Sequence, residues 1–153
     1  MKRKNGLHFW LLVAAVFVLD QGTKHFVQLR YLPGESQVVL PQFFHLTYVQ
    51  NTGAAFGILV EWTQFFIGLT LVLLLVLFLY CRKFSNSDRL IRLALALVVG
   101  GGVGNLLDRL RLGYVVDFLD FRVWPVFNVA DMAIVSGAIV LAFKLFSLSR
   151  DQL

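Results

Sequence analysis

A stretch of twenty residues, 62–81, contains no charged side chain, and this run constrains the fold more than any other feature of the chain. A helix of about 20 apolar residues is the length needed to cross the hydrocarbon core of a bilayer. The chain has 153 residues, of which 58% are hydrophobic and 15% are charged. Soluble domains carry about 25% charged residues. The sequence therefore predicts an integral membrane protein.

Four apolar segments have the length and composition of membrane-spanning helices. They cover about residues 7–29, 62–81, 90–110 and 127–146. The first follows three basic residues, as the apolar core of a signal peptide would, but no small-residue cleavage site follows it, so we expect an uncleaved anchor. The connections between the segments are short, and we expect residues 1–153 to form one membrane-embedded domain.

Lysine and arginine are concentrated at the N-terminus, in the connection after the second segment and near the C-terminus. The positive-inside rule assigns these parts to the cytoplasm, which explains the net charge of +5 without nucleic acid binding. Residues 36–57 would then face outward, and they contain β-like runs at 38–40 and 43–49. We expect an all-α membrane protein of four helices, with a small sheet on the outer membrane surface.

Asp117 and Asp131 lie near the outer ends of the third and fourth segments. A carboxylate in the hydrocarbon layer costs about 2.5–3.5 kcal/mol even on insertion scales, so its presence indicates a function. If the two approach closely, repulsion and burial raise the pKa of one while the other stays ionised, and the pair titrates as a unit. The ionised member can activate a water molecule and the protonated one can donate to a carbonyl oxygen, as in aspartic proteases. Asp120 is an alternative to Asp117, but nothing near it indicates burial beyond the interface.

Polar residues of the first and third segments also point to a site inside the bundle. Asp20 and Lys24 are four residues apart, in the order that favours an intrahelical ion pair, which could also be a helix-end pair with no other role. Glycines 100–102 and 104 would let neighbouring membrane helices approach closely. Three polar residues after them share one helix face, which must look into the bundle or a polar pocket. These are Asn105, Asp108 and Arg109.

Two further motifs carry polar residues close to the outer face. Residues 51–57 form a loop of small residues whose glycines permit close approach of a ligand backbone, although a plain turn into the membrane is also consistent with them. Asn128 lies three residues before Asp131, so its amide could orient that carboxylate.

Five motifs occur in a characteristic order. They are Asp20-Gln21-Gly22-Thr23-Lys24, residues 51–57, Gly101–Arg109, Val115–Phe118 and Phe127–Asp131. Together they resemble lipoprotein signal peptidase, also called signal peptidase II, over essentially the whole chain. The resemblance implies an intramembrane aspartic endopeptidase of the bacterial inner membrane. Such enzymes remove the signal peptide of diacylglyceryl-modified prolipoproteins just before the lipid-bearing cysteine.

By this resemblance Asp117 and Asp131 are the catalytic pair, and residues 36–57 form an extracytoplasmic β-cradle. The residues that line or support the substrate site are, on the same basis, Asn51, Gly53, Asn105, Asp108, Arg109 and Asn128, with Asp20 and Lys24 as a supporting ion pair. No metal or cofactor is expected, because the carboxylates supply both acid and base. The expected partners are prolipoprotein substrates and membrane lipid, and four spans can enclose the site in a monomer.

Two other classes of function are consistent with parts of this pattern. In a small proton- or cation-coupled transporter, Asp20, Asp108 and Asp131 would relay charge across the bilayer. A transporter needs ionisable groups spread across the membrane, however, and here they gather toward one face. A non-catalytic scaffold could hold a partner helix in the glycine-rich groove, but that leaves the clustered carboxylates unexplained.

Overall fold

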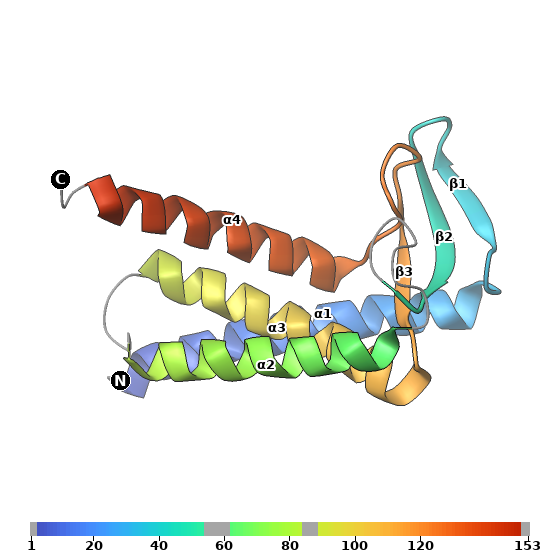
Figure 1. Cartoon of the computed structure of the whole chain (residues 1–153). Helices are drawn as coiled ribbons and strands as arrows, with labels where there is room; N and C mark the ends of the chain where they lie inside the picture. Colours follow the sequence, from blue (N-terminus) through green and yellow to red (C-terminus); the bar gives the residue numbers. More distant parts are fainter. Residues whose placement is uncertain (1–2, 54–61, 84–88, 151–153) are drawn as a thin grey trace.

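The computed structural model describes residues 3–53, 62–83 and 89–150. Four helices run along one another, with a three-stranded sheet at one end (Figure 1). The helices are α1 (Arg3–Arg30), α2 (Thr63–Lys83), α3 (Arg89–Leu112) and α4 (Val129–Arg150). They coincide with the four apolar segments of the sequence to within about a turn. The start of α1 and the end of α4 both lie at the end away from the sheet (Figure 1).

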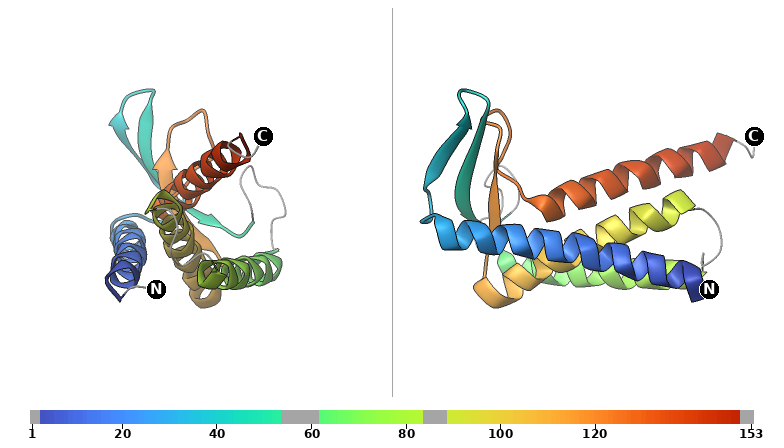
Figure 2. Two further views of the ribbon diagram at one scale, coloured as in Figure 1. Left: turned by 90° about the vertical axis from the view of Figure 1, so that its left-hand side faces the viewer. Right: turned by 180° about the vertical axis from the view of Figure 1, so that it is seen from behind.

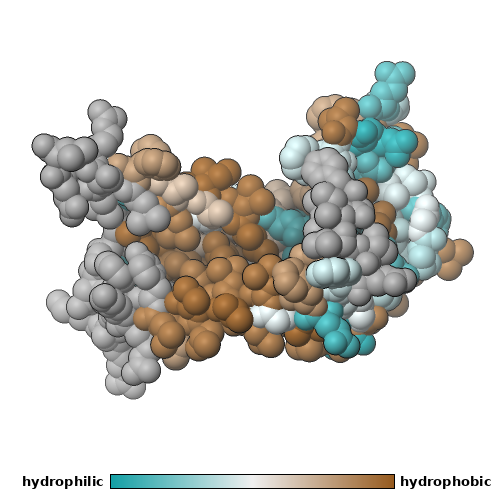
Figure 3. Space-filling model, viewed as in Figure 1, coloured by the Kyte–Doolittle hydropathy of each residue, from teal (hydrophilic) through white to brown (hydrophobic). Residues whose placement is uncertain are grey.

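Two of the described helices are long and apolar enough to cross a membrane, Gly6–Arg30 and Arg89–Leu112. A third apolar helix, Thr63–Leu79, is shorter. Large apolar side chains of α2, such as Leu75 and Leu79, are more than half exposed, as expected of a surface that contacts lipid. On the face shown in Figure 3, hydrophobic residues predominate over the helices, and most of the hydrophilic residues lie at the sheet end.

The glycines of α3 allow this helix to contact each of the other three and to lie between them (Figure 2). A Cβ atom added at Gly100 would lie 2.9 Å from Cβ of Val16 in α1. One added at Gly101 would lie 2.4 Å from the carbonyl oxygen of Ala130 in α4. Side chains at these positions would push the helices apart, so the predicted role of the glycines in close packing is confirmed.

The sheet is antiparallel in the order β1–β2–β3, with β1 at Ser36–Leu40, β2 at Phe44–Asn51 and β3 at Val115–Asp120. The two β-like runs of the sequence are confirmed as strands. The sheet also contains a third strand that was not predicted from the sequence, because β3 comes from the segment between α3 and α4. Residues 54–57 lie outside the described part of the chain.

Two local signals place the ends of α3 and α4 beside the sheet. Gly113 adopts a φ of 80° and its N–H donates to the carbonyl oxygen of Arg109 at 3.1 Å, so α3 ends in a left-handed cap and the chain turns at once into β3. Asn128 precedes the first residue of α4. Asp117 and Asp131, far apart on an extended chain, are thereby brought to the same end of the bundle.

Candidate active site

Asp117 lies on β3, and two amide side chains hold its carboxylate. Nδ2 of Asn51, at the end of β2, donates to Oδ2 at 2.8 Å, and Nδ2 of Asn128 donates to Oδ1 at 2.6 Å. The side chain is 2% exposed. Within the described residues no lysine or arginine forms an ion pair with it. Both oxygens therefore have neutral donors, which stabilise the ionised form less than a cation does.

Asp131 lies in the first turn of α4 and forms a reciprocal cap with Asn128. The backbone N–H of Asn128 donates to Oδ2 of Asp131 at 3.2 Å, and the N–H of Asp131 donates to Oδ1 of Asn128 at 2.9 Å. This is the geometry of a capping box, formed by asparagine and aspartate. Nδ2 of Asn105 donates to Oδ1 of Asp131 at 2.8 Å. Asn128 and Asp131 contact each other as predicted, but the carboxylate of Asp131 accepts from the backbone N–H of Asn128 rather than from its side-chain amide.

Asn128 is fully buried and joins the two aspartates. Its Oδ1 accepts the Asp131 N–H, so its Nδ2 must face Asp117 and Oδ1 of Asn105. Oδ1 of Asn105 also accepts from Nζ of Lys24 at 2.8 Å, so its Nδ2 must face Asp131. Both amide orientations follow from partners that can only donate. All four carboxylate oxygens of Asp117 and Asp131 consequently receive an N–H.

The environment of Asp117 suits a group that exchanges a proton near neutral pH. Burial, and after it the charge of Asp131, raise the pKa of Asp117 to about 7. The hydrogen bonds from Asn51 and Asn128 and the charge of Lys24 act in the opposite direction and offset part of this rise. An acid with a pKa near the working pH is well matched to general acid–base chemistry. The site can therefore hold one proton between two carboxylates.

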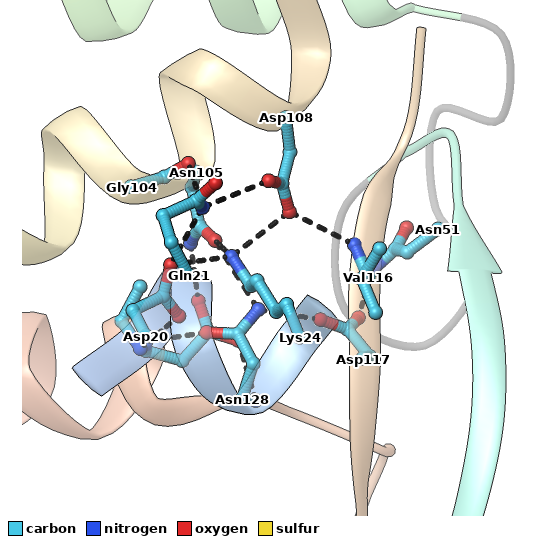
Figure 4. A network of polar contacts seen from close by, with 12 residues as sticks. Asp20, Gln21, Lys24, Asn51, Gly104, Asn105, Asp108, Val116, Asp117 and Asn128 are labelled. Carbon is cyan, nitrogen blue, oxygen red and sulfur yellow. Dashed lines mark hydrogen bonds and ion pairs between the residues drawn. The ribbon is translucent and has the colours of Figure 1, made fainter. Parts of the chain in front are cut away.

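A buried ion cluster of Asp20, Lys24 and Asp108 lies next to Asn105 (Figure 4). Nζ of Lys24 lies 2.9 Å from Oδ2 of Asp20 on α1 and 2.9 Å from Oδ2 of Asp108 on α3. The predicted Asp20–Lys24 pair is confirmed, and Asp108 joins it. Sequence reasoning did not single out Gln21, whose Nε2 donates to Asp20 at 3.1 Å and to Asp108 at 3.0 Å. Its polar side chain between two ionic residues in an apolar segment was the signal that could have identified it.

Arg109 contacts a different part of the site from Asn105 and Asp108. Its Nη2 donates to the carbonyl oxygen of Gly53 at 3.4 Å, and its guanidinium lies 5.2 Å from the centre of the Phe66 ring. Its Nε is buried and has no hydrogen-bond partner among the described residues. The N–H of Gly53 donates to Oδ1 of Asn51 at 3.0 Å, which turns Nδ2 of Asn51 toward Asp117. Arg109 and Gly53 thus form one wall beside the carboxylates.

Asp120 is buried, contrary to the expectation from the sequence, with 5% of its surface exposed. Its Oδ2 accepts from Oγ1 of Thr47 at 2.8 Å and from Nη1 of Arg122 at 3.1 Å. The expectation was wrong because Thr47 belongs to a neighbouring strand that is distant in sequence. Asp120 has no hydrogen bond to Asp117 or Asp131 and does not belong to the pair.

The comparisons with known proteins agree on one family. Residues 12–147 match the model of the family described as signal peptidase (SPase) II. A lipoprotein signal peptidase of Moorella thermoacetica is 52% identical over 145 residues, which cover 94% of this chain and 96% of that protein. The chain belongs to the signal peptidase II family.

Two further similarities support the assignment to signal peptidase II. A lipoprotein signal peptidase of Caldanaerobacter subterraneus subsp. tengcongensis is 50% identical over 134 residues, which cover 87% of this chain and 92% of that protein. A solved bacterial membrane enzyme has a TM-score of 0.89 at 31% identity, covering 95% of this chain and 92% of the other. Membership confirms the predicted enzyme class, a membrane peptidase, and we set the transporter and scaffold alternatives aside.

Proposed function

We propose that this signal peptidase II uses Asp117 and Asp131 as a catalytic pair to cleave diacylglyceryl-modified prolipoproteins just before the lipid-bearing cysteine. The observation that carries the proposal is the amide of Asn128, which bonds to both residues. Family membership gives the peptidase activity, and the contacts of Asn128 support the choice of pair, because its Nδ2 donates to the carboxylate of Asp117 and its Oδ1 accepts from the backbone N–H of Asp131. Asp120, the alternative on the same strand, is bonded to Arg122.

In the proposed mechanism Asp117 holds the proton and Asp131 is ionised. Asp131 accepts a proton from water as the water oxygen attacks the scissile carbonyl carbon, and Asp117 donates its proton to the carbonyl oxygen. The tetrahedral intermediate then collapses. Asp131 gives its proton to the leaving amine as the C–N bond breaks, and a hydroxyl of the intermediate returns a proton to Asp117. The pair ends in its starting protonation state.

The wall formed by Arg109 and Gly53 is proposed to bind the substrate. A guanidinium can donate two parallel hydrogen bonds to carbonyl or ester oxygens, which a peptide with attached acyl chains offers. Nε of Arg109 supports this role, because it has no acceptor among the described residues and a buried donor without an acceptor is costly unless a ligand supplies one. Asn51 orients Asp117 at the edge of the same wall.

The four helices are proposed to span the bacterial inner membrane, with both termini in the cytoplasm and the sheet at the outer face. Two observations support this orientation. The basic residues are concentrated near the two termini and around the connection between α2 and α3, and the helix ends next to these positions lie away from the sheet (Figure 1). Two apolar helices meet the length criterion for spanning. The substrate, a signal helix with two acyl chains, would approach from lipid to a site at the interface, which one copy of the chain can provide as a monomer.

The test is a gel-shift cleavage assay with the purified protein in lipid. The substrates are a diacylglyceryl-modified prolipoprotein and the same precursor without the lipid. We expect cleavage of only the modified form, and loss of cleavage in both Asp117→Asn and Asp131→Asn with the variants still folded. Normal turnover by either variant would remove that residue from the pair, and equal cleavage of the unmodified precursor would contradict the proposed substrate class.

A further inference from the structure

The ion cluster of Asp20, Lys24 and Asp108 contacts the backbone next to each proposed catalytic aspartate. Oδ1 of Asp20 accepts from the N–H of Ala130, the residue before Asp131, at 2.9 Å. Oδ2 of Asp108 accepts from the N–H of Val116, the residue before Asp117, at 3.1 Å. The spacing of the sequence gives no indication of either contact, since each joins a helix side chain to the backbone of a different element.

Lys24 connects these two contacts. Its ammonium lies 2.9 Å from a carboxylate oxygen of each acid, so the path from Ala130 to Val116 runs through three side chains and no solvent. The exposed fractions of Asp20, Lys24 and Asp108 are 0%, 2% and 4%. Lys24 also donates to Asn105, whose amide donates to Asp131. One ammonium on α1 thereby reaches the segments that carry both aspartates (Figure 4).

A contribution to stability is a weak explanation for such a cluster. Removing three charges from water is expensive, and buried ion pairs replaced by well-packed apolar residues often leave a protein equally or more stable. The cluster also requires a residue without a side chain at position 104. A Cβ atom at Gly104 would lie 2.4 Å from Oδ2 of Asp20, so the carboxylate lies directly against the backbone of α3. These charges are better explained by a role in positioning the backbone segments that they contact.

We propose that Asp20, Lys24 and Asp108 form a clamp that positions Asp131 and Asp117 relative to each other through the backbone N–H groups of Ala130 and Val116. The clamp residues are positioning residues and do not touch the substrate. This inference rests on the proposed function, since it concerns the spacing of the proposed catalytic pair. It assigns the cluster a role in turnover rather than in substrate binding, because a displacement of about 1 Å in reacting groups costs on the order of 100-fold in rate.

The clamp predicts unequal effects for two substitutions to asparagine. Asp20 uses different oxygens for Lys24 and for Ala130, so Asp20→Asn must turn an N–H toward one of these donors and breaks one contact. Asp108 accepts from Lys24 and Val116 with Oδ2, so Asp108→Asn can keep both contacts through its one carbonyl oxygen and gives up only the contact of Oδ1 with Gln21. Asp108→Ala keeps neither. The conservative variant at position 108 is therefore expected to retain function where alanine does not.

The experiment measures kcat and KM on the lipidated precursor for these three variants and for the double variant Asp20→Asn/Asp108→Ala. We expect kcat to fall roughly tenfold or more in Asp20→Asn and Asp108→Ala, with KM within about twofold, and to stay within about threefold of wild type in Asp108→Asn. Because the two acids act through one lysine, the double variant is expected to lose at most about threefold more than the worse single variant. The matched control is Asp120→Asn, a buried carboxylate of β3 that does not contact Lys24, which should keep its kcat.

Several results would overturn the clamp. One is a wild-type kcat in both Asp20→Asn and Asp108→Ala, and another is a change in KM without a change in kcat. The clamp is also contradicted if the losses of the single variants multiply in the double variant, or if Asp108→Asn is as impaired as Asp108→Ala. Circular dichroism and the thermal midpoint establish folding, and if Asp108→Ala does not fold, the kcat of Asp20→Asn against Asp108→Asn decides. Asp117→Asn in the same assay separates the two proposals. If Asp117→Asn cleaves the precursor, the proposed catalytic pair is contradicted. If Asp117→Asn is inactive while the clamp variants are fully active, only the clamp is contradicted.

Discussion

Asp117 and Asp120 are two buried carboxylates on the same strand, and their pKa values shift in opposite directions. Burial and the charge of Asp131 raise the pKa of Asp117 to about 7. Burial also favours the neutral form of Asp120, but hydrogen bonds from Thr47 and Arg122, together with the charge of Arg122, outweigh it and lower its pKa. Low solvent exposure alone therefore does not make a catalytic acid. The depth of burial and the partners of the carboxylate together decide whether it can carry a proton near neutral pH.

The two environments correspond to two uses of a carboxylate. Asp117 receives only neutral amide donors and faces a second acid, an arrangement in which a proton can be held and released. Asp120 accepts from the backbone N–H of Arg122 at 2.8 Å, and Arg122 has a φ of 64°, so this carboxylate holds a tight turn after β3. The environment of Asp117 suits acid–base chemistry, whereas that of Asp120 stabilises the local structure.

The largest difference is expected when each carboxylate is replaced by its amide in turn. Asp117→Asn should lower kcat by roughly 1,000-fold or more, because general acid–base groups contribute about 100- to 10,000-fold and the members of a pair act as a unit. Asp120→Asn should stay within about threefold of wild type. Cleavage of the lipidated precursor measures both. Comparable losses in the two variants would contradict the distinction.

A second difference is that the proposed pair, unlike Asp120, depends on the ion cluster of Asp20, Lys24 and Asp108, and Gly104 tests this dependence on the Asp131 side, through Asp20. The added methyl group of Gly104→Ala would displace the carboxylate of Asp20, which lies 2.4 Å from the Cβ position, and should lower kcat on the order of 10- to 100-fold. Gly102→Ala is the matched control, since its Cβ would lie 3.4 Å from the side chain of Leu74. Equal activity of the two alanine variants would argue that Asp20 can move freely.

The arginines near the two carboxylates should also differ. Arg109→Ala should raise KM about tenfold with a smaller change in kcat, because the guanidinium beside Gly53 is proposed to bind substrate oxygens before the reaction. Arg122→Ala should leave KM unchanged, since Arg122 is paired with Asp120. Steady-state kinetics across a range of substrate concentrations separates the two constants. An unchanged KM in Arg109→Ala would contradict substrate binding by Arg109 and leave it a structural role only.

The smallest effect is expected in the pH profile. As pH rises through about 7, Asp117 loses its proton and the pair becomes doubly ionised, so kcat/KM should fall with an apparent pKa near this value. The hydrogen bond from Asn51 stabilises the ionised carboxylate of Asp117. Its removal in Asn51→Ala should therefore shift the fall in kcat/KM to higher pH. Asp120→Asn should leave the pH of this fall unchanged. A shift to lower pH in Asn51→Ala would contradict the claim that Asp117 is the titrating group.

The sequence was sufficient to predict the parts of this molecule that depend on local patterns. Continuous apolar runs gave the four helices, and alternation with turn residues gave β1 and β2. The i, i+4 spacing of Asp20 and Lys24 and the i, i+3 spacing of Asn128 and Asp131 predicted contacts that the structure contains. Each of these depends on residues within one element or its cap.

Contacts between distant elements could not be predicted in the same way. β3 was not expected, because a six-residue strand is identified mainly by its partner β2, which precedes it by more than sixty residues. The burial of Asp120 was underestimated for the same reason. The second partner of Lys24, Asp108, and the backbone contacts to Val116 and Ala130 depend on how three elements pack, and side-chain spacing along one helix carries no information about them.

The most direct test is to locate the proton. Difference infrared spectroscopy of the purified protein, titrated from about pH 5 to 9, follows the carbonyl stretch of a protonated carboxylic acid. We expect a band that is lost with a midpoint near pH 7 in the wild type and in Asp120→Asn, and that is absent from Asp117→Asn. A band that persists in Asp117→Asn, or one that disappears in Asp120→Asn, would contradict the claim that Asp117 carries the proton of the pair.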